Sequence, residues 1–471
     1  MQLALSSVAR PLKLPLMNRH REQATPERKA FPPGAVSAWR FAACNGLSFQ
    51  IVLGGTMILY AKSLGASATV LGLIAGMMPL MVIFQIPAAA YLNRISYKRF
   101  LLGGWGTRQL FTCGMAIIPM ATGYLDATTQ LVLLLSFLLG FNFLRGVSTC
   151  AWLPLITHLI PEKLLGLYLS GEATMSNLGS FVTVILCALC LGKQPHPWQF
   201  AIAFGFSALT GLASLFFLNR IPDVPITPDV RRSNEPVPWL EMLRHPSFRG
   251  FLLFVVVWSL AYGGVTAFSL AFLKAKSGLP DGTILLVTAL AFLGGLGSMW
   301  IGSRRLDRFG CKPIIGLSLG AWLLILLIWL AFSGGELKIQ LWLVAVVQLG
   351  MGLFAALIGV ANNRLAMGII PSMGRSHFLV LYSVFANLAL GLAPVAWGLL
   401  IDLIGQHEFQ MAGLAWNQFS IFFALVIILF LVTFWLMRWL HEPQASGINE
   451  LLHDMLIQSP QRLWISVWVR H

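Results

Sequence analysis

Charged residues are scarce in this sequence, and their scarcity excludes a soluble globular fold. Only 10% of its 471 residues are Asp, Glu, Lys or Arg, while 57% are hydrophobic and the mean hydropathy is +0.77. Soluble domains carry roughly 25% charged residues. The basic residues that give the chain its net charge of +15 stand between apolar segments. We therefore expect lipid headgroups, and no nucleic acid, as their partner.

Groupings of residues typical of catalysis or metal binding are missing as well. The six Cys lie in or beside apolar segments, and Cys187 and Cys190 have neither a second Cys pair nor a nearby His. The nine His are scattered without a metal-ligand spacing. The sequence contains no phosphate-binding loop and no nucleophile elbow. We predict that the protein is not an enzyme or an ATP-driven pump, and that it holds no metal and no cofactor.

Long hydrophobic segments, in contrast, are abundant. Between residues 41 and 440 the chain has twelve of them, each about long enough to cross the hydrocarbon layer, which takes roughly 20 residues as a helix. They predict an all-α integral membrane protein with 12 transmembrane helices. The predicted divisions are a disordered cytoplasmic tail (1–36), an N-terminal six-helix bundle (37–219), a cytoplasmic linker (220–247), a C-terminal six-helix bundle (248–441) and a cytoplasmic amphipathic tail (442–471).

The distribution of Lys and Arg predicts the orientation of these helices. If both termini are cytoplasmic, the inner loops hold fifteen basic residues and the outer loops hold five. The outer five are Lys62, Lys193, Lys274, Lys276 and Lys338. This positive-inside bias favours cytoplasmic termini. No signal peptide is recognised at the N-terminus, and we expect a multi-pass protein of a bacterial cytoplasmic (inner) membrane.

A short basic turn occurs twice at corresponding places, which indicates a tandem repeat. Residues 302–313 read GSRRLDRFGCKP and residues 91–99 read YLNRISYKR, at an offset of 214 residues. The turn resembles the Asp-Arg-x-Gly-x-Lys loop signature of the major facilitator superfamily of secondary transporters. In the first copy Asn93 replaces the acid and Ser96 replaces Gly. The resemblance covers about residues 40–440 and implies two six-helix repeats.

The same resemblance implies a cytoplasmic latch between the two halves. Its predicted members are Asn93, Arg94, Lys98, Asp307, Arg308, Gly310 and Lys312. It also implies that span 11 (377–403) is broken near Gly391 and Pro394. Gly263 and Gly264 predict a flexible point in span 7 (249–273).

Polar residues inside the predicted spans give the candidate substrate site. Asn142, Arg145 and Thr149 share one helix face, and a guanidinium suits a carboxylate or phosphate. Alternatively, Arg145 extends towards the inner surface. For Arg108 we expect a structural role. The resemblance places further members on spans that face the central pathway, and the full predicted set is Gln50, Asn142, Arg145, Thr149, Trp258, Tyr262, Gln348 and Asn387.

Glu172 is the single acidic residue placed inside a span. It is a weak candidate for proton coupling, and the alternative is a structural pairing with Arg305 or Arg308. The sequence predicts a monomeric carrier that moves a small anionic or hydrogen-bonding solute by alternating access, with proton or ion coupling left open. Two other functions stay open: a transport-inactive membrane sensor or assembly protein of the same fold, and a lipid or lysolipid flippase.

Overall fold

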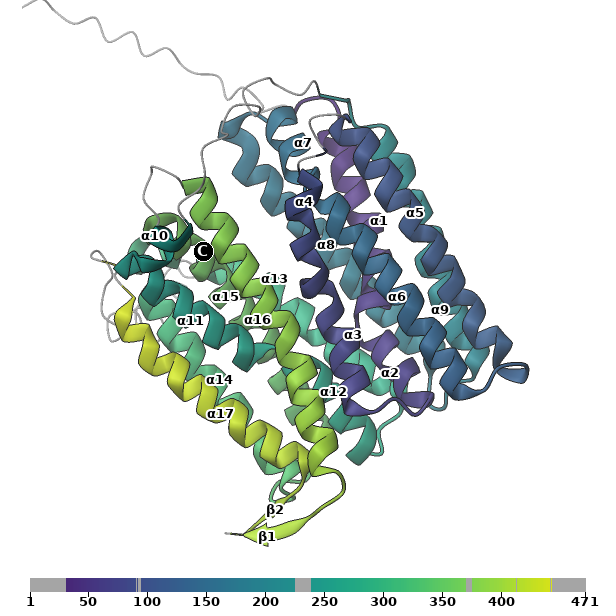
Figure 1. Ribbon diagram of the computed structural model, residues 1–471. Helices are drawn as coiled ribbons and strands as arrows, with labels where there is room; N and C mark the ends of the chain where they lie inside the picture. The colour runs from purple at the N-terminus through teal and green to yellow at the C-terminus, as the bar shows by residue number, and fades with distance from the viewer. Residues whose placement is uncertain are drawn as a thin grey trace, which may run out of the picture.

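The structure is almost entirely helical. The computed structural model describes residues 31–89, 91, 95–224, 239–369, 375–411, 413–440 and 442. Within these residues eleven helical segments are long and apolar enough to cross a membrane (Figure 1). Large apolar side chains on these segments are strongly exposed, among them Leu403 at 82%, Leu189 at 75% and Leu209 at 68%. Such a surface is suited to contact with lipid.

The first half contains helices α1 to α9. Their bounds are α1 (Ala35–Leu53), α2 (Gly55–Ser63), α3 (Ala68–Met81), the 3₁₀ turn η1 (Val82–Phe84), α4 (Gln85–Ala89), α5 (Tyr97–Ile117), the 3₁₀ turn η2 (Ile118–Gly123), α6 (Ala127–Thr149), α7 (Trp152–Leu159), α8 (Glu162–Leu191) and α9 (Pro197–Asn219). Side-chain caps begin several of them. Ser67, Ser96 and Asp126 each accept a backbone N–H in the first turn of α3, α5 and α6.

The second half contains helices α10 to α17. Their bounds are α10 (Trp239–Arg244), α11 (Pro246–Tyr262), α12 (Val265–Lys276), α13 (Asp281–Phe309), α14 (Cys311–Ser333), α15 (Leu341–Ile369), α16 (Arg375–Ile404), α17 (Gln418–Leu436) and the 3₁₀ turn η4 (Met437–Trp439). A short antiparallel hairpin of β1 (Phe409–Met411) and β2 (Leu414–Trp416) joins α16 to α17.

One predicted span, α5, is not among the eleven apolar helices. Its sequence contains Lys98, Arg99 and Arg108, which lower its hydropathy. The helix is 21 residues long and packs along α6 and α9 inside the first half. Helix α5 therefore corresponds to the one predicted span that is missing from the eleven.

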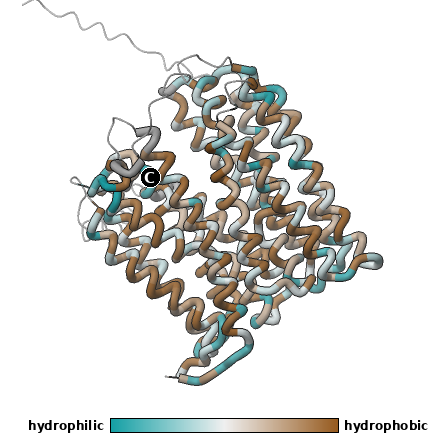
Figure 2. Tube along the Cα trace, viewed as in Figure 1, coloured by the Kyte–Doolittle hydropathy of each residue, from teal (hydrophilic) through white to brown (hydrophobic). Residues whose placement is uncertain are grey.

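The two ends of the bundle differ in composition. We call the lower end in Figure 1 the hairpin end, made of residues 64–67, 192–196, 277–280 and the β1–β2 hairpin. The upper end, with α7, α10, residues 95–96 and residues 220–224, is called the basic end. Figure 2 shows hydrophobic residues along the helices and hydrophilic residues gathered towards the two ends. This distribution fits a bundle that crosses a bilayer.

The expected break in span 11 is wrong. Helix α16 runs without interruption from Arg375 to Ile404 with Pro394 inside it. Membrane helices tolerate such a proline when the backbone group that it frees is buried in protein or lines a cavity. In span 7, helix α11 ends at Tyr262 and α12 begins at Val265, so the helix is interrupted at the two glycines. That this point is flexible stays a prediction.

The first helices of the two halves begin close to the predicted starts of the two bundles. Helix α1 begins at Ala35, not at 37, and α11 begins at Pro246, not at 248. The short helix α10 falls within the range predicted as a linker. The predicted N-terminal tail up to residue 30 and the amphipathic tail after Glu442 lie outside the described residues.

Candidate functional site

A cavity of about 390 Å³ lies at the seam between the two halves. Its wall is built from α1, α2 and α3 of the first half and from α11, α12, α13, α15 and α16 of the second. Four of the predicted substrate residues lie in this wall, namely Gln50, Tyr262, Gln348 and Asn387. The fold thus gathers residues from positions 50 to 387 around one space.

Helix interruptions in both halves lie on the cavity wall. Helix α1 ends at Leu53, and at the following Gly54 a Cβ atom would approach the Gln50 carbonyl oxygen to 2.3 Å. On the opposite side α11 and α12 are separated by Gly263 and Gly264, and Gly264 has a φ of 88°. Non-helical backbone at membrane depth occurs where it lines a cavity, and it offers polar groups to a substrate there. The interruption at Gly54 was missed because glycines are common in apolar membrane helices.

Polar and aromatic groups give the wall its chemistry. Gln348 is 2% exposed and its Nε2 has no hydrogen-bond partner among the described residues. Asn387 Nδ2 donates to the Ser383 carbonyl of its own helix at 2.8 Å. The Tyr262 ring stacks on Trp258, with centroids 5.3 Å apart. Trp258 is therefore placed behind the wall, where it positions Tyr262.

The predicted polar face of span 4 does not line this cavity. Asn142 is buried and its Nδ2 donates to the Leu138 carbonyl, while Thr149 Oγ1 donates to the Arg145 carbonyl. Both side chains are thus used by their own helix, α6. The Arg145 guanidinium instead lies against α1, with its Cζ atom 5.1 Å from the Phe49 ring centroid.

A second arginine lies on the other side of the same helix contact. Arg108 of α5 is 1% exposed, and its Nη2 donates to Asn45 Oδ1 at 2.6 Å. Its Cζ atom lies 4.7, 5.2 and 5.3 Å from the ring centroids of Phe49, Trp105 and Phe141. This aromatic enclosure is consistent with the expected structural role, although it leaves part of the guanidinium without a partner among the described side chains.

Glu172, the weak coupling candidate, lies near the basic end of α8. Its Oε1 accepts a hydrogen bond from Trp152 Nε1 at 2.9 Å, and its Oε2 is buried without a partner in the described part of the chain. The side chain of Arg305 lies outside the described residues, so a pairing with it stays a prediction.

The second copy of the basic turn is tied to its own half. The backbone N–H groups of Cys311 and Lys312 donate to the Glu442 carboxylate at 2.8 and 2.7 Å, and Lys312 Nζ donates to the Leu440 carbonyl at 3.2 Å. Glu442 therefore caps α14 just after Gly310. Asn93, Arg94 and the side chain of Asp307 lie outside the described residues, so the predicted latch stays a prediction.

A contact between the halves that the sequence did not reveal lies at the hairpin end. Asp402, on α16, accepts hydrogen bonds from the N-terminus of α3 in the other half. Its Oδ1 accepts from Ala68 N at 2.9 Å, and its Oδ2 accepts from Thr69 N at 2.7 Å and from Thr69 Oγ1 at 2.6 Å. A carboxylate at a helix N-terminus is stabilised by the unpaired N–H groups and by the helix dipole.

A second contact between the halves, between α8 and α13, lies at the same end. Gly282 N of α13 donates to the Gly192 carbonyl at the end of α8, at 2.9 Å. One residue earlier, the buried carboxylate of Asp281 pairs with Lys274 of α12. The two most extensive helix pairs between the halves, α3 with α16 and α8 with α13, are thus hydrogen-bonded at the hairpin end.

Two helical halves around a seam cavity, with a few polar side chains in its wall, define a class, the secondary transporters built from two helical repeats. Sequence comparison gives the family. Residues 41–304 and 264–469 match the model of the Major Facilitator Superfamily, and the chain belongs to that superfamily. No curated protein matches the chain.

Solved structures of transporters share this fold. A D-xylose–proton symporter superposes with a TM-score of 0.68 at 14% identity, covering 88% of this chain and 99% of that one. The nucleoside transporter NupG gives 0.62 at 11% identity, covering 87% and 98%. A POT family transporter in complex with 5-aminolevulinic acid gives 0.63 at 13% identity, covering 87% and 97%. At these identities the likeness extends to the fold alone.

Proposed function

We propose that this protein carries a small solute across the membrane by alternating access. The seam cavity would be the binding site, and the two halves would rock about it so that it opens to each side in turn. We place the basic end in the cytoplasm, because the basic residues between the spans concentrate there. The xylose symporter and the nucleoside transporter of the same fold transport small polar solutes.

The observation that carries this proposal is the closure of one end over a mainly apolar cavity that contains a few polar side chains. The hydrogen bonds that Asp402 accepts from α3, and the one that Gly282 N donates to the Gly192 carbonyl, join the halves at the hairpin end. None of these positions lies in the cavity wall formed by Gln50 and Gln348. Breaking a few polar contacts and separating two helix pairs would open that end, which is the kind of bistable contact that a rocking carrier needs.

Uptake into proteoliposomes tests the proposal. A panel of labelled sugars, amino acids, nucleosides, carboxylates and phosphate esters would be assayed with and without a pH gradient. For a transported solute we expect Gln348→Leu to raise KM about two- to tenfold, because a net hydrogen bond contributes about 0.5 to 1.5 kcal/mol. The unpartnered Nε2 of Gln348 is buried at the wall, so its removal costs no hydrogen bond to the described residues.

Gln109→Leu is the matched control. Gln109 is equally buried, at 1% exposed, and its amide is also without a partner among the described side chains, but it lies on α5 away from the cavity wall. Its substitution should leave KM unchanged. If the wild-type protein takes up no solute of the panel under any gradient, the carrier function is wrong and the sensor alternative is favoured. If Gln348→Leu and Gln109→Leu raised KM equally, the cavity would not be the binding site of the solute.

A further inference from the structure

Two arginines carry positive charge into the apolar interior of the first half. Arg108 of α5 and Arg145 of α6 both lie against the ring of Phe49 on α1, with Cζ atoms 4.7 and 5.1 Å from its centroid. The two Cζ atoms are therefore no further apart than these two distances together. Arg108 is buried and Arg145 is partly buried, so water screens the charges far less than at a surface.

No carboxylate among the described side chains neutralises this pair. Neither arginine has a carboxylate oxygen of the described residues within 4 Å, and the two ion pairs that these residues provide, at Lys274 and Lys276, lie in the second half. Glu172 is the only acidic residue well inside the described spans of the first half, and its hydrogen bond comes from Trp152. An arginine inside a membrane protein normally pairs with an acid, faces water or meets a ligand.

Hydrogen-bond donors without partners also indicate that a negatively charged group is missing beside the two arginines. Nε and Nη1 of Arg108 and Nη1 of Arg145 are buried and make no hydrogen bond to the described part of the chain. The remaining partner of Arg108 is the neutral amide oxygen of Asn45. Aromatic faces and a neutral amide compensate a buried guanidinium only in part. A negatively charged acceptor would satisfy both the donors and the charge.

We propose that Arg145 and Arg108 form a subsite for a carboxylate or phosphate group of the solute, an assignment that rests on the carrier function proposed above. Arg145 is the more exposed of the two, and its planar fork of donors makes the direct contact. Arg108 supplies a second positive charge from the far side of the helix contact. Phe49 directly precedes Gln50, which lines the seam cavity. In this proposal the anionic group binds at the arginine pair, and the cavity holds the rest of the solute.

Thermal unfolding of the full-length protein in detergent tests the subsite without requiring transport. Inorganic phosphate and benzoate serve as anionic probes, and glucose and choline, at matched ionic strength, as neutral and cationic probes. We expect at least one anion to raise Tm, because a ligand that binds only the folded state stabilises it. Glucose and choline should leave Tm unchanged. Equal shifts with all four probes, or no shift with either anion, would overturn the subsite.

Substitutions then assign the effect to the two arginines. Arg145→Gln should weaken anion binding by on the order of tenfold, which corresponds to about 1.4 kcal/mol. Arg145→Lys keeps the charge but loses the planar fork of donors. Its anion affinity should therefore lie between those of the wild type and Arg145→Gln. Arg108→Gln should weaken binding as well. A structural role alone would lower the Tm of the ligand-free Arg145→Gln protein and leave its anion affinity unchanged, and that result would refute the assignment.

Arg40→Gln is the matched control. Arg40 also lies over a phenylalanine ring, with its Cζ atom 6.0 Å from the Phe217 centroid, but it is exposed. Its substitution should leave the anion response unchanged. Uptake assays separate the two proposals. A protein that transports only neutral or cationic solutes keeps the carrier function and loses the subsite, whereas an Arg145-dependent anion response without uptake of any solute keeps the subsite and loses the carrier function.

Discussion

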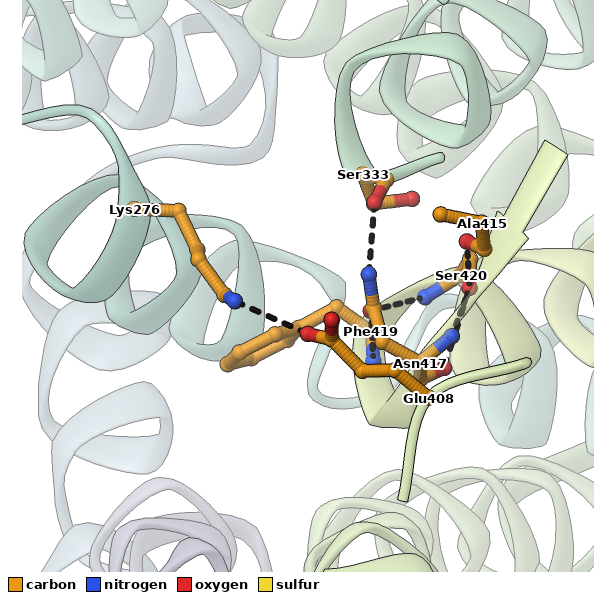
Figure 3. A network of polar contacts seen from close by, with 7 residues as sticks. All are labelled: Lys276, Ser333, Glu408, Ala415, Asn417, Phe419 and Ser420. Atoms are coloured by element: carbon orange, nitrogen blue, oxygen red, sulfur yellow. Dashed lines mark hydrogen bonds and ion pairs between the residues drawn. The ribbon is translucent and has the colours of Figure 1, made fainter. Parts of the chain in front are cut away.

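Asn417 joins two helix ends with one side chain at the hairpin end (Figure 3). Its Oδ1 accepts from Phe419 N and Ser420 N at the start of α17, and its Nδ2 donates to the Ser333 carbonyl at the end of α14 at 2.7 Å. Asn417→Ala should destabilise the protein by about 2 kcal/mol, because the loss of an N-cap costs about 1 kcal/mol and the buried carbonyl left without a partner costs on the order of 1 kcal/mol more. Thermal unfolding in detergent measures the loss.

A neighbouring polar contact in Figure 3 provides the control. Lys276 Nζ lies 3.1 Å from Glu408 Oε1, but the two side chains are 48% and 54% exposed. Exposed ion pairs contribute little, since water and salt screen them. Glu408→Gln should therefore leave the unfolding temperature unchanged. A loss as large as that of Asn417→Ala would show that burial is not what makes the asparagine contact matter.

At the scale of elements, glycines set the distance between α3 and α16. A Cβ atom at Gly72 would lie 2.1 Å from the Pro394 carbonyl oxygen, and one at Gly76 would lie 2.2 Å from the Gly391 carbonyl oxygen. Both contacts are to backbone of the other half, which cannot move aside as a side chain can. Small residues at such crossings allow close packing of membrane helices. We expect Gly72→Ala to separate the two helices and to increase labelling of cysteines placed at the hairpin end.

Gly359→Ala on α15 is the control for this prediction. A Cβ atom there would meet nothing within 4 Å, so alanine should be neutral or slightly stabilising by its helix propensity. Equal labelling in Gly72→Ala and wild type would mean that the two helices do not separate at this contact.

The sequence predicted these elements better than their contacts. Hydropathy located the apolar spans, and two adjacent glycines located the interruption after Tyr262. Pro394 was expected to break α16 but does not, because a helix in this environment can lose one hydrogen bond beside a cavity wall. Gln50, Tyr262, Gln348 and Asn387 are predicted as site residues because they lie near mid-span on helices that the family resemblance places along the central pathway. The structure places all four in one wall.

Side-chain direction and long-range partners could not be predicted. Helical spacing puts Asn142, Arg145 and Thr149 on one face, but it does not say that two of them hydrogen-bond their own backbone. Asp402 stands near the end of span 11. Its partners Ala68 and Thr69 are 334 and 333 residues away, and no local sequence pattern predicts a contact over such a separation.

For the whole molecule, the contact of Asp402 with the N-terminus of α3 should favour the state closed at the hairpin end. Its three hydrogen bonds, from Ala68 N, Thr69 N and Thr69 Oγ1, span the two halves. Because the contact is exposed, we assign its three bonds about 1.4 kcal/mol in total, close to the low end for a single hydrogen bond to a charged group. Asp402→Ala should therefore raise the population open at the hairpin end about tenfold. Asp402→Asn, which keeps one carbonyl acceptor, should raise it less.

Labelling from outside intact cells measures this population. Thr266 lies in the cavity wall, so Thr266→Cys in a background without native cysteines reports when an impermeant maleimide can reach the cavity from the hairpin end. The labelling rate should increase about tenfold in Asp402→Ala, in proportion to the open fraction. Glu408→Gln removes a charge at the same end without touching α3 and should leave the rate unchanged. Equal rates in Asp402→Ala and wild type would show that closure of the hairpin end depends on helix packing and not on this carboxylate.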